Sequence, residues 1–325
     1  MTRAAIIGAG PIGLELAVAF KQAGIDYVQF DAGQIGSTIA WYPLQMLFHS
    51  SADRLALSGV PIQTPTQQKP TREEYLAYLR SIVQQFGLTV HTFEPVIDVK
   101  PGFTLTTTKG TYHADNIVLA IGAMHAPRRL DVPGEDLPHV SHYFRDPHDY
   151  FGRRLVIVGG RNSAVEAAIR CQRIGADVTL TYRGADFDAS VVKWWLLPEL
   201  RGMIRDGRVR FLPSTHVLSI SRDAVQLDTG EIAADAVLVM TGYRQETTLF
   251  DMLGVDLVDP SREPAHDPET METNVPGVFI AGTAVAGTPP RKVSVIVETC
   301  HVHVPRIVGA IMGQRVHVPD GRFDD

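Results

Sequence analysis

The chain has 325 residues, 45% of them hydrophobic and 20% charged, which is typical of a soluble globular protein with room for two ordinary domains. Its 30 Lys and Arg against 36 Asp and Glu give a net charge of −6, so we expect no nucleic-acid partner and no anionic membrane partner. Because the first predicted strand begins at Arg3 and no run of about 18 apolar residues occurs, we expect neither a signal peptide nor a membrane span.

A strand–turn–helix–strand pattern opens the chain. Residues 3–7 predict a strand, GAGPIG at 8–13 a Gly-rich turn, residues 14–23 a helix and residues 27–31 a second strand. This order is that of a βαβ unit with a right-handed crossover, which predicts a parallel sheet.

The residue types in this unit indicate a dinucleotide site. Gly8 permits a tight turn, Gly10 lets the backbone approach a pyrophosphate, and Gly13 lets the helix pack closely on the strand. The helix N-terminus favours the anion, and Asp31 stands where a carboxylate can accept a hydrogen bond from a ribose hydroxyl. An ordinary Gly turn is the alternative, but strand, turn, helix and terminal acid at this spacing favour the nucleotide.

A β-hairpin-like region is predicted to close the first domain. Its two alternating runs are residues 104–108 and 116–120, separated by Lys109-Gly110. Residues 120–122 then end the second run in a Gly-permitted turn, where we expect the chain to leave the domain.

A second copy of the βαβ pattern follows. Residues 155–158 predict a strand, GGRNSA at 159–164 the turn, residues 163–174 a helix and residues 178–183 the next strand. Two such units predict two nucleotide-binding folds rather than one long Rossmann domain.

Two arginines distinguish this second unit. Arg161 replaces the middle glycine of the turn, so its side chain must swing away from the pyrophosphate or itself reach a phosphate. Arg183 ends the second strand, where an NAD enzyme carries an acid, and a guanidinium there suits the 2′-phosphate of NADP. We therefore expect NADPH rather than NADH; a solvated surface arginine is the alternative for Arg183.

The end of the chain returns to the first fold. An alternating region at 208–242 ends in Met240-Thr241-Gly242, and a strand at 277–281, a turn at 282–283 and an apolar helix at about 292–313 follow. No strand follows that helix, so we assign it to the first domain.

The predicted fold class is α/β, with two Rossmann-like three-layer domains, the second inserted in the first. The predicted boundaries are 1–122 plus 243–325 for the first domain and 123–242 for the second.

These pieces together resemble the two-dinucleotide-domain flavoproteins of the thioredoxin reductase superfamily. TNVPGVFIAG at 273–282 is similar to the second FAD motif of that superfamily. The resemblance implies that the first domain binds FAD and the inserted domain NAD(P)H. It implies a FAD-dependent pyridine-nucleotide oxidoreductase that passes a hydride from NADPH to flavin and on to an unidentified small-molecule or small-protein acceptor.

Within the superfamily the chain is most similar to the YpdA-type bacillithiol disulfide reductases. The stretches that carry this likeness are WYP at 41–43, FHSS at 48–51, VPGEDLP at 132–138, GGRNSA at 159–164, YRGADF at 182–187, LPE at 197–199, MTGY at 240–243 and PETMETNVPGVFIAG from Pro268.

The chain departs from this resemblance at three places. Thioredoxin reductases carry a C-x-x-C where this chain reads YFRD at 143–146. The YpdA-type proteins lack that dithiol but carry a cysteine inside the first Gly-rich turn, where this chain has Ile12. The second FAD motif has Thr283 in place of the usual Asp, which leaves a weaker partner for the flavin ribityl chain.

Motifs and resemblance together predict the cofactor-binding residues. For FAD they are Gly8, Gly10, Pro11, Ile12, Gly13, Asp31, Ala120, Gly122, Gly282 and Thr283. For NADPH they are Gly159, Gly160, Arg161, Asn162, Ser163, Ala164, Arg183, Thr241 and Gly242.

Only two cysteines are available for thiol chemistry, Cys171 and Cys300, and no C-x-x-C occurs; this count fits a reducing cytoplasm. Thiol–disulfide exchange needs a thiolate, and Cys171 lies on a predicted helix where packing is the preferred interpretation. Cys300 and Glu298 are weak catalytic candidates, because in this superfamily the last helix approaches the flavin. Core packing for Cys300 and a surface role for Glu298 are the alternatives.

Two aromatic pairs and several histidines complete the candidates. Trp41-Tyr42-Pro43 and Lys193-Trp194-Trp195 are able to stack on a cofactor or acceptor, but plain packing is the preferred interpretation. No acid or cysteine spacing completes a metal site around the histidines, which are His139, His142, His148, His301 and His303, so we predict no metal.

Three alternatives to the flavin-dependent NADPH oxidoreductase stay open. They are a flavin-dependent monooxygenase, a disulfide reductase that uses the flavin directly or Cys300, and a non-catalytic NADPH- or redox-sensing module. We expect a cytoplasmic protein, with a homodimer or higher homo-oligomer as a possible state.

Overall fold

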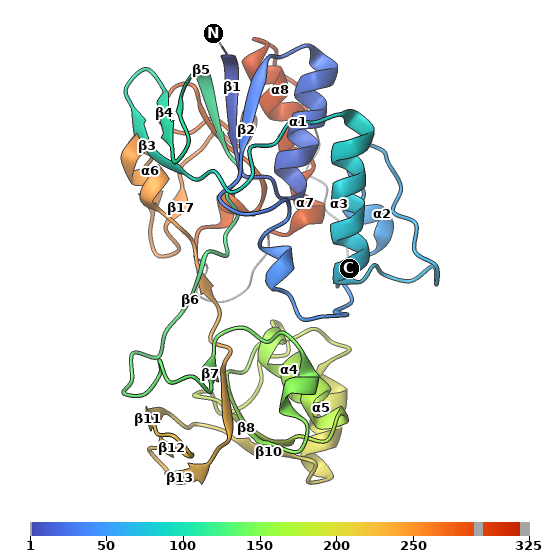
Figure 1. The fold of residues 1–325 in the computed structure, drawn as a ribbon, viewed down its shortest axis with the longest axis vertical. Helices are drawn as coiled ribbons and strands as arrows, with labels where there is room; N and C mark the ends of the chain where they lie inside the picture. Colours follow the sequence, from blue (N-terminus) through green and yellow to red (C-terminus); the bar gives the residue numbers. More distant parts are fainter. Residues whose placement is uncertain (1, 289–294, 319–325) are drawn as a thin grey trace. The chain divides into compact units, whose positions relative to one another are not determined.

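The computed structural model describes residues 2–288 and 295–318, and it divides into two compact units (Figure 1). The first unit comprises the chain up to Ala40, Gln45–Ala126 and the chain from Arg244 onward. The second comprises Trp41–Leu44 and Pro127–Tyr243. The chain leaves the first unit within β6 (Ala126–Pro127) and returns within β15 (Tyr243–Arg244).

The core of the first unit is a set of parallel strands. β1 (Thr2–Ile7) lies between β2 (Tyr27–Phe30) and β5 (Thr111–Leu119), and β18 (Val278–Ile280) pairs with β5. The middle of β1 is completely buried, as expected of a parallel strand with both faces covered.

The predicted hairpin is confirmed, although β5 begins earlier than the sequence indicated. β3 (Val96–Lys100), β4 (Thr104–Thr107) and the first part of β5 form antiparallel pairs. Residues 111–113 of β5 pair with β4, whereas residues 114–119 pair with β1. β5 therefore continues from the hairpin into the parallel strands.

Helices cover one side of these strands. α1 (Pro11–Ala23) starts at the Gly-rich turn and packs against α3 (Arg72–Phe86) and α8 (His303–Ile311) (Figure 1). α6 (Thr248–Leu253) contacts β3 instead. α3 begins with a capping box, in which the Thr71 hydroxyl accepts from the Glu74 backbone N–H.

The predicted last helix is divided in two. The described part forms α7 (Val297–Cys300) and α8, with a turn at residues 301 and 302, while residues 292–294 lie outside the described residues. Pro305 supplies the physical reason, because its ring would clash with the carbonyl of residue 301 in a continuous helix and it has no N–H to donate.

The second unit is built on a five-stranded parallel sheet with the order β10-β9-β8-β14-β7. The strands are β7 (Val140–Ser141), β8 (Arg154–Val158), β9 (Asp177–Thr181), β10 (Val209–Leu212) and β14 (Ala236–Val239). The predicted second βαβ unit is confirmed, since β8 and β9 are parallel and joined by a helix.

This sheet is the middle of three layers (Figure 1). α4 (Asn162–Arg173) and α5 (Leu197–Arg205) pack on one face. On the other, valines of β8 and β14 pack against a three-stranded antiparallel sheet. Its strands are β11 (Val217–Ile220), β12 (Ala224–Leu227) and β13 (Gly230–Ala233).

Short elements complete the molecule. They are η1 (Ile39–Trp41), α2 (Ala52–Leu55), η2 (Pro147–Tyr150), β16 (Leu257–Val258), β17 (Glu263–Pro264) and η3 (Gly282–Ala286). Among residues 2–288 and 295–318, no helix has the length and apolarity that crossing a membrane requires.

Candidate functional site

The first Gly-rich turn is closely packed at two glycines and open at the third. A Cβ atom added to Gly8, whose φ is +116°, would lie 2.3 Å from the Ala120 carbonyl oxygen. A Cβ added to Gly13 would lie 2.3 Å from the Gly8 carbonyl oxygen. A Cβ on Gly10 would meet no atom within 4 Å. The turn thus needs Gly8 and Gly13 for its own packing and leaves free space at Gly10.

The N-terminus of α1 begins at this free space. Gly10 is the N-cap residue and Pro11 follows it, and no side chain caps the helix. The first backbone N–H groups of a helix have no partner within it, and they carry the positive end of the helix dipole. This end of α1 is therefore suited to an anion such as a pyrophosphate.

Asp31 bonds directly to the Gly-rich turn, which the sequence did not indicate. Its Oδ2 accepts from the Ala9 backbone N–H at 2.7 Å, and its Oδ1 accepts from the Gly33 N–H at 2.8 Å. Burial raises the pKa of this carboxyl group, while these hydrogen bonds oppose the rise. Asp31 therefore holds the turn in shape with part of its acceptor capacity, and lone pairs remain for a ribose hydroxyl.

The second predicted FAD segment meets the first inside the same unit. Gly282 lies against Ile12, since a Cβ on Gly282 would be 3.4 Å from the Ile12 Cβ. The hydroxyl oxygen of Thr283 would be 3.6 Å from a Cβ on Gly122. The structure thus gathers four predicted residues from three distant parts of the sequence.

Two further residues bond to this region in a way that the sequence did not indicate. His303 is buried, and its Nδ1 accepts from the Gly282 backbone N–H at 3.1 Å. Gln245 is buried too and donates from its side-chain amide to the carbonyls of Gly122 and Ala284. No local pattern marks either residue, because both act through contacts that are distant in sequence.

The Gly-rich turn of the second unit also has glycines at positions where a side chain would not fit. Gly159 has a φ of +148°, and a Cβ there would lie 2.5 Å from the Met240 carbonyl oxygen. A Cβ on Gly160 would lie 2.6 Å from the ring of Tyr182. The N-cap residue of α4 is Arg161, with no side-chain cap, so this helix also presents uncapped N–H groups.

Some of the side chains predicted around this turn already form hydrogen bonds within the protein, and others are exposed to solvent. The Asn162 amide donates to the Val191 carbonyl at 3.1 Å and accepts from the Lys193 backbone N–H at 2.7 Å. One amide proton and one lone pair of Oδ1 are thus used within the protein. The Thr241 hydroxyl donates to the Arg128 carbonyl at 2.5 Å. Arg183 is exposed at the end of β9.

Both cysteines are fully buried. Burial raises the pKa of the Cys171 thiol and of the Cys300 thiol to about 12 each, so both are protonated near neutral pH. They lie in different units. Glu298, the other catalytic candidate, keeps its Oε2 buried without a hydrogen-bond partner among the described residues.

The two predicted aromatic pairs differ in their surroundings. The Trp41 ring lies 5.5 Å from the Tyr143 ring and 6.5 Å from the Tyr243 ring, measured between centroids. Trp194, however, is 79% exposed. Its neighbour Trp195 has the Lys193 ammonium group 5.6 Å from its ring centroid.

Two of the candidate histidines, His301 and His142, hold their ring nitrogens close to protein oxygens. His301 places Nδ1 2.7 Å from a Glu15 carboxylate oxygen and Nε2 2.9 Å from the Arg54 carbonyl oxygen. His142 places Nε2 2.8 Å from Glu135. Among residues 2–288 and 295–318, no three His, Cys, Asp or Glu side chains come together as a metal would require.

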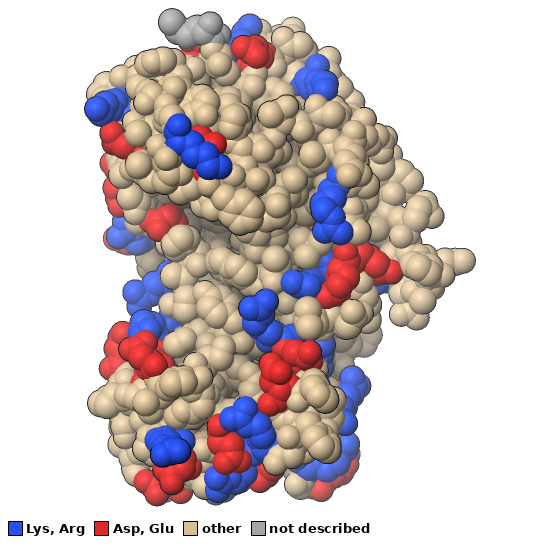
Figure 2. Space-filling model, viewed as in Figure 1, with Lys and Arg blue, Asp and Glu red and all other residues tan. Residues whose placement is uncertain are grey.

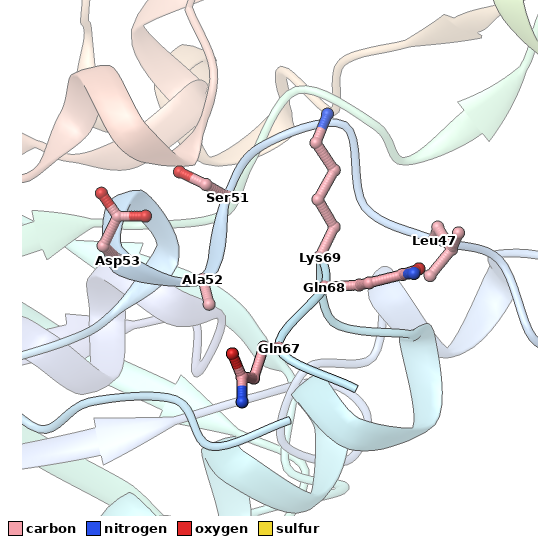
Figure 3. Close-up of a pocket in the computed structure, with 7 residues that line it drawn as sticks. All are labelled: Leu47, Ser51, Ala52, Asp53, Gln67, Gln68 and Lys69. Carbon is pink, nitrogen blue, oxygen red and sulfur yellow. The ribbon is translucent and has the colours of Figure 1, made fainter. Parts of the chain in front are cut away.

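A surface pocket of about 460 Å³ lies elsewhere in the first unit (Figure 3). Its lining residues are Leu47, Ser51, Ala52, Asp53, Gln67, Gln68 and Lys69. Neither Gly-rich turn contributes to it. The lining carries both charge signs, and acidic and basic side chains are likewise interspersed on the face of the molecule in Figure 2. Charge therefore does not mark the pocket as a nucleotide site.

A family model described as pyridine nucleotide-disulphide oxidoreductase matches residues 5–282. The chain belongs to this family. It is therefore a flavin-dependent pyridine-nucleotide oxidoreductase, and the prediction that it is an enzyme is confirmed.

Relatives agree with this family membership. Bacilliredoxin reductase Bdr of Bacillus subtilis (strain 168) is 36% identical over 324 residues, which cover 97% of this chain and 99% of the relative. The structure of bacillithiol disulfide reductase Bdr (YpdA) from Bacillus cereus superposes with a TM-score of 0.91 at 34% identity, over 96% of this chain and 99% of that one. The resemblance to the YpdA-type proteins is confirmed.

A more distant structure shows the fold alone. Thioredoxin reductase from T. acidophilum superposes with a TM-score of 0.74 at 20% identity, over 95% of this chain and 98% of that chain. The predicted α/β class with two Rossmann-like domains is confirmed.

Proposed function

We propose that this protein is an NADPH-dependent FAD oxidoreductase that reduces a small-molecule or small-protein acceptor without a redox-active cysteine of its own. The first unit holds FAD and the second holds NADPH. When bound, FAD supplies the hydride acceptor and electron donor that no side chain of the chain provides.

The observation that carries this proposal is the combination of two nucleotide turns with two inert thiols. Each unit has a closely packed Gly-rich turn that leads into a helix with an uncapped N-terminus. Both thiols are buried and protonated, so neither is ready to attack a disulfide. The family's cofactor chemistry is thus supported, whereas a chain thiol is not.

The residues of the first unit fit FAD. The free space at Gly10 and the uncapped α1 N-terminus suit the pyrophosphate, while Asp31 holds the turn and is able to accept from the ribose. The Thr283 hydroxyl, next to Gly122, is the proposed partner of the ribityl chain.

We assign NADPH to the second unit because positive charge lies where the phosphates of NADPH would bind. The α4 N-terminus suits the pyrophosphate, and Arg183 is an exposed guanidinium at the end of β9, where a 2′-phosphate would lie. Arg161, at the α4 N-cap, is the second cation of this turn.

A disulfide is the second candidate for the acceptor. The relative from B. subtilis is a bacilliredoxin reductase, and the solved structure from B. cereus is a bacillithiol disulfide reductase. The YpdA-type cysteine is Ile12 here, so a disulfide acceptor would have to be reduced by the flavin directly.

The test is purification and reconstitution with FAD, followed by NADPH oxidation with a panel of acceptors. The panel contains ferricyanide, a quinone, a low-molecular-weight disulfide and oxygen. We expect one FAD bound per chain, faster turnover with NADPH than with NADH, and turnover with at least one acceptor. Failure to bind FAD would refute the proposal, and tight NADPH binding without any turnover would favour a sensing module.

A further inference from the structure

Gln245 is buried at the point where three segments of the first unit meet. Its side chain is 7% exposed. Its backbone N–H donates to the Thr288 hydroxyl at 3.0 Å. Its side-chain Nε2 donates to the Ala284 carbonyl at 2.6 Å and to the Gly122 carbonyl at 3.3 Å. Gln245 therefore joins the 120–122 turn to η3.

These contacts fix the orientation of the amide. Both protons of Nε2 have a carbonyl acceptor, and a flipped amide would place Oε1 against the same two carbonyl oxygens. Oε1 is consequently the atom left over. It is buried and has no hydrogen-bond partner among the described residues.

A buried acceptor without a partner is uncommon, because it loses its bond to water and gains nothing in return. Gln29 also keeps a buried Oε1 without a partner, but its Nε2 donates to a single carbonyl, that of Gly8 at 2.9 Å. Of these two glutamines, Gln245 is the one at which two carbonyls dictate which atom is left to accept. This arrangement calls for an N–H or O–H donor.

The position of Gln245 indicates which molecule supplies that donor. Its two carbonyl partners belong to Gly122 and to Ala284, which follows Thr283, and both Gly122 and Thr283 are proposed FAD residues. FAD carries donors of the required type, namely the imide N–H of the flavin ring and the ribityl hydroxyls.

We propose that Gln245 is a further FAD-binding residue, whose buried Oε1 accepts a hydrogen bond from an imide N–H or a ribityl hydroxyl of the cofactor. The assignment rests on the proposed function, because it requires FAD in the first unit. It adds a residue that holds the 120–122 turn and η3 with its donors and the cofactor with its acceptor.

The test compares FAD binding by three apoproteins: wild type, Gln245→Met and Gln226→Met. Methionine removes the donors and the acceptor at nearly constant volume. Gln226 is the matched control, since it lies on β12 in the second unit and its side-chain amide donates to the neighbouring Leu227 carbonyl. We expect the FAD dissociation constant to rise about 5- to 100-fold for Gln245→Met, the loss expected for one or two hydrogen bonds, and to stay within about twofold for the control.

Two further measurements distinguish FAD binding by Gln245 from a purely structural role. They are the thermal midpoint of each apoprotein and the FAD affinity of Gln245→Glu. The carboxylate keeps an oxygen in place of Oε1 but turns the other against two carbonyl oxygens. If Gln245 binds FAD, the Glu variant binds it more tightly than the Met variant, although its apoprotein is the less stable of the two. If FAD affinity instead follows apoprotein stability across all variants, or Gln245→Met binds FAD as wild type does, the proposal is overturned.

An FAD analogue methylated at the imide nitrogen distinguishes the two donors. If the imide is the donor, the methyl group weakens binding to wild type but hardly affects Gln245→Met. If a ribityl hydroxyl is the donor, Gln245→Met weakens the binding of FAD and of the methylated analogue by the same factor. A wild type that binds no FAD would overturn the proposed function with this assignment, whereas a wild type that binds FAD as tightly as Gln245→Met would overturn the assignment alone.

Discussion

The side chain of Ile12, in the first Gly-rich turn, packs against Gly282 of the second FAD-like motif, so closely that a Cβ on Gly282 would lie 3.4 Å from the Ile12 Cβ. Ile12 is only 4% exposed. In the YpdA-type proteins a cysteine occupies this place in the turn, and here an apolar side chain fills it. The contact therefore joins two parts of the proposed cofactor site and leaves no thiol between them.

Ile12→Ala should destabilise the protein, because the deletion leaves a cavity between the turn and Gly282. We expect the free energy of unfolding to fall by about 2–5 kcal/mol in denaturant titration of the apoprotein. Ile97→Ala is the matched control, since Ile97 is 50% exposed and its loss should cost far less. Equal losses at the two positions would show that Ile12 is not packed as described.

Gly10→Ala and Gly13→Ala should have different consequences. A Cβ on Gly13 would overlap the Gly8 carbonyl, so this variant should lower the thermal midpoint of the apoprotein. A Cβ on Gly10 meets no protein atom, and the Gly10 φ of −74° suits alanine. Gly10→Ala should therefore keep the apoprotein's stability but lose FAD affinity by tenfold or more, as equilibrium titration with FAD would measure. Unchanged affinity would place the pyrophosphate elsewhere.

Arg183→Ala should weaken the binding of NADPH and leave the binding of NADH unchanged. The loss of a charged hydrogen bond of about 1.5–3 kcal/mol corresponds to roughly a 10- to 100-fold rise in the NADPH KM. Steady-state kinetics with both cofactors measure the ratio, and Arg222→Ala, an exposed arginine near the antiparallel sheet of the second unit, is the control. Equal changes for NADPH and NADH would remove the 2′-phosphate role from Arg183.

His301 should make the stability of the first unit depend on pH. Both its ring nitrogens face acceptors, the Glu15 carboxylate and the Arg54 carbonyl, which favours the doubly protonated ring. Although burial opposes this, the hydrogen bond and charge of Glu15 raise the His301 pKa above its usual 6.5, and the charge of Glu298 acts in the same direction. The stabilisation is thus complete below about pH 6.5 and is lost as pH rises through the folded-state pKa.

The measurement for His301 is the free energy of unfolding of wild type and of His301→Asn between mildly acidic and mildly alkaline pH. The difference between the two proteins should be largest at the acidic end and shrink as pH rises. His216→Asn is a suitable control, because His216 is exposed in the second unit, where it contacts Asp228. A difference that grows with pH would contradict the account.

The parts of this molecule that sequence could predict are those set by local chemistry. Gly8, Gly13 and Gly159 stand where the backbone itself demands glycine, and such demands repeat at fixed spacing. Pro305, by contrast, divides the last helix although the apolar pattern runs through it.

Contacts between segments that are distant in the sequence could not be predicted from it. The bond from Ala9 to Asp31 spans 22 positions, and that from Gln245 to Ala284 spans 39. Each depends on which side chains the folded sheet brings together. The exposure of Trp194 belongs to the same class, because an aromatic pair in a sequence does not reveal which of its two rings will be covered.

The central claim is that electrons pass through this enzyme without a redox-active disulfide of the chain. Anaerobic titration of the FAD-loaded protein with NADPH, followed by bleaching of the flavin absorbance, tests it most directly. A flavin alone takes up one electron pair, whereas a flavin with a disulfide takes up two. We predict complete bleaching at about one equivalent of NADPH per FAD, with the same end point for the Cys171→Ala, Cys300→Ala double variant. An end point at two equivalents that falls to one in the double variant would contradict the account.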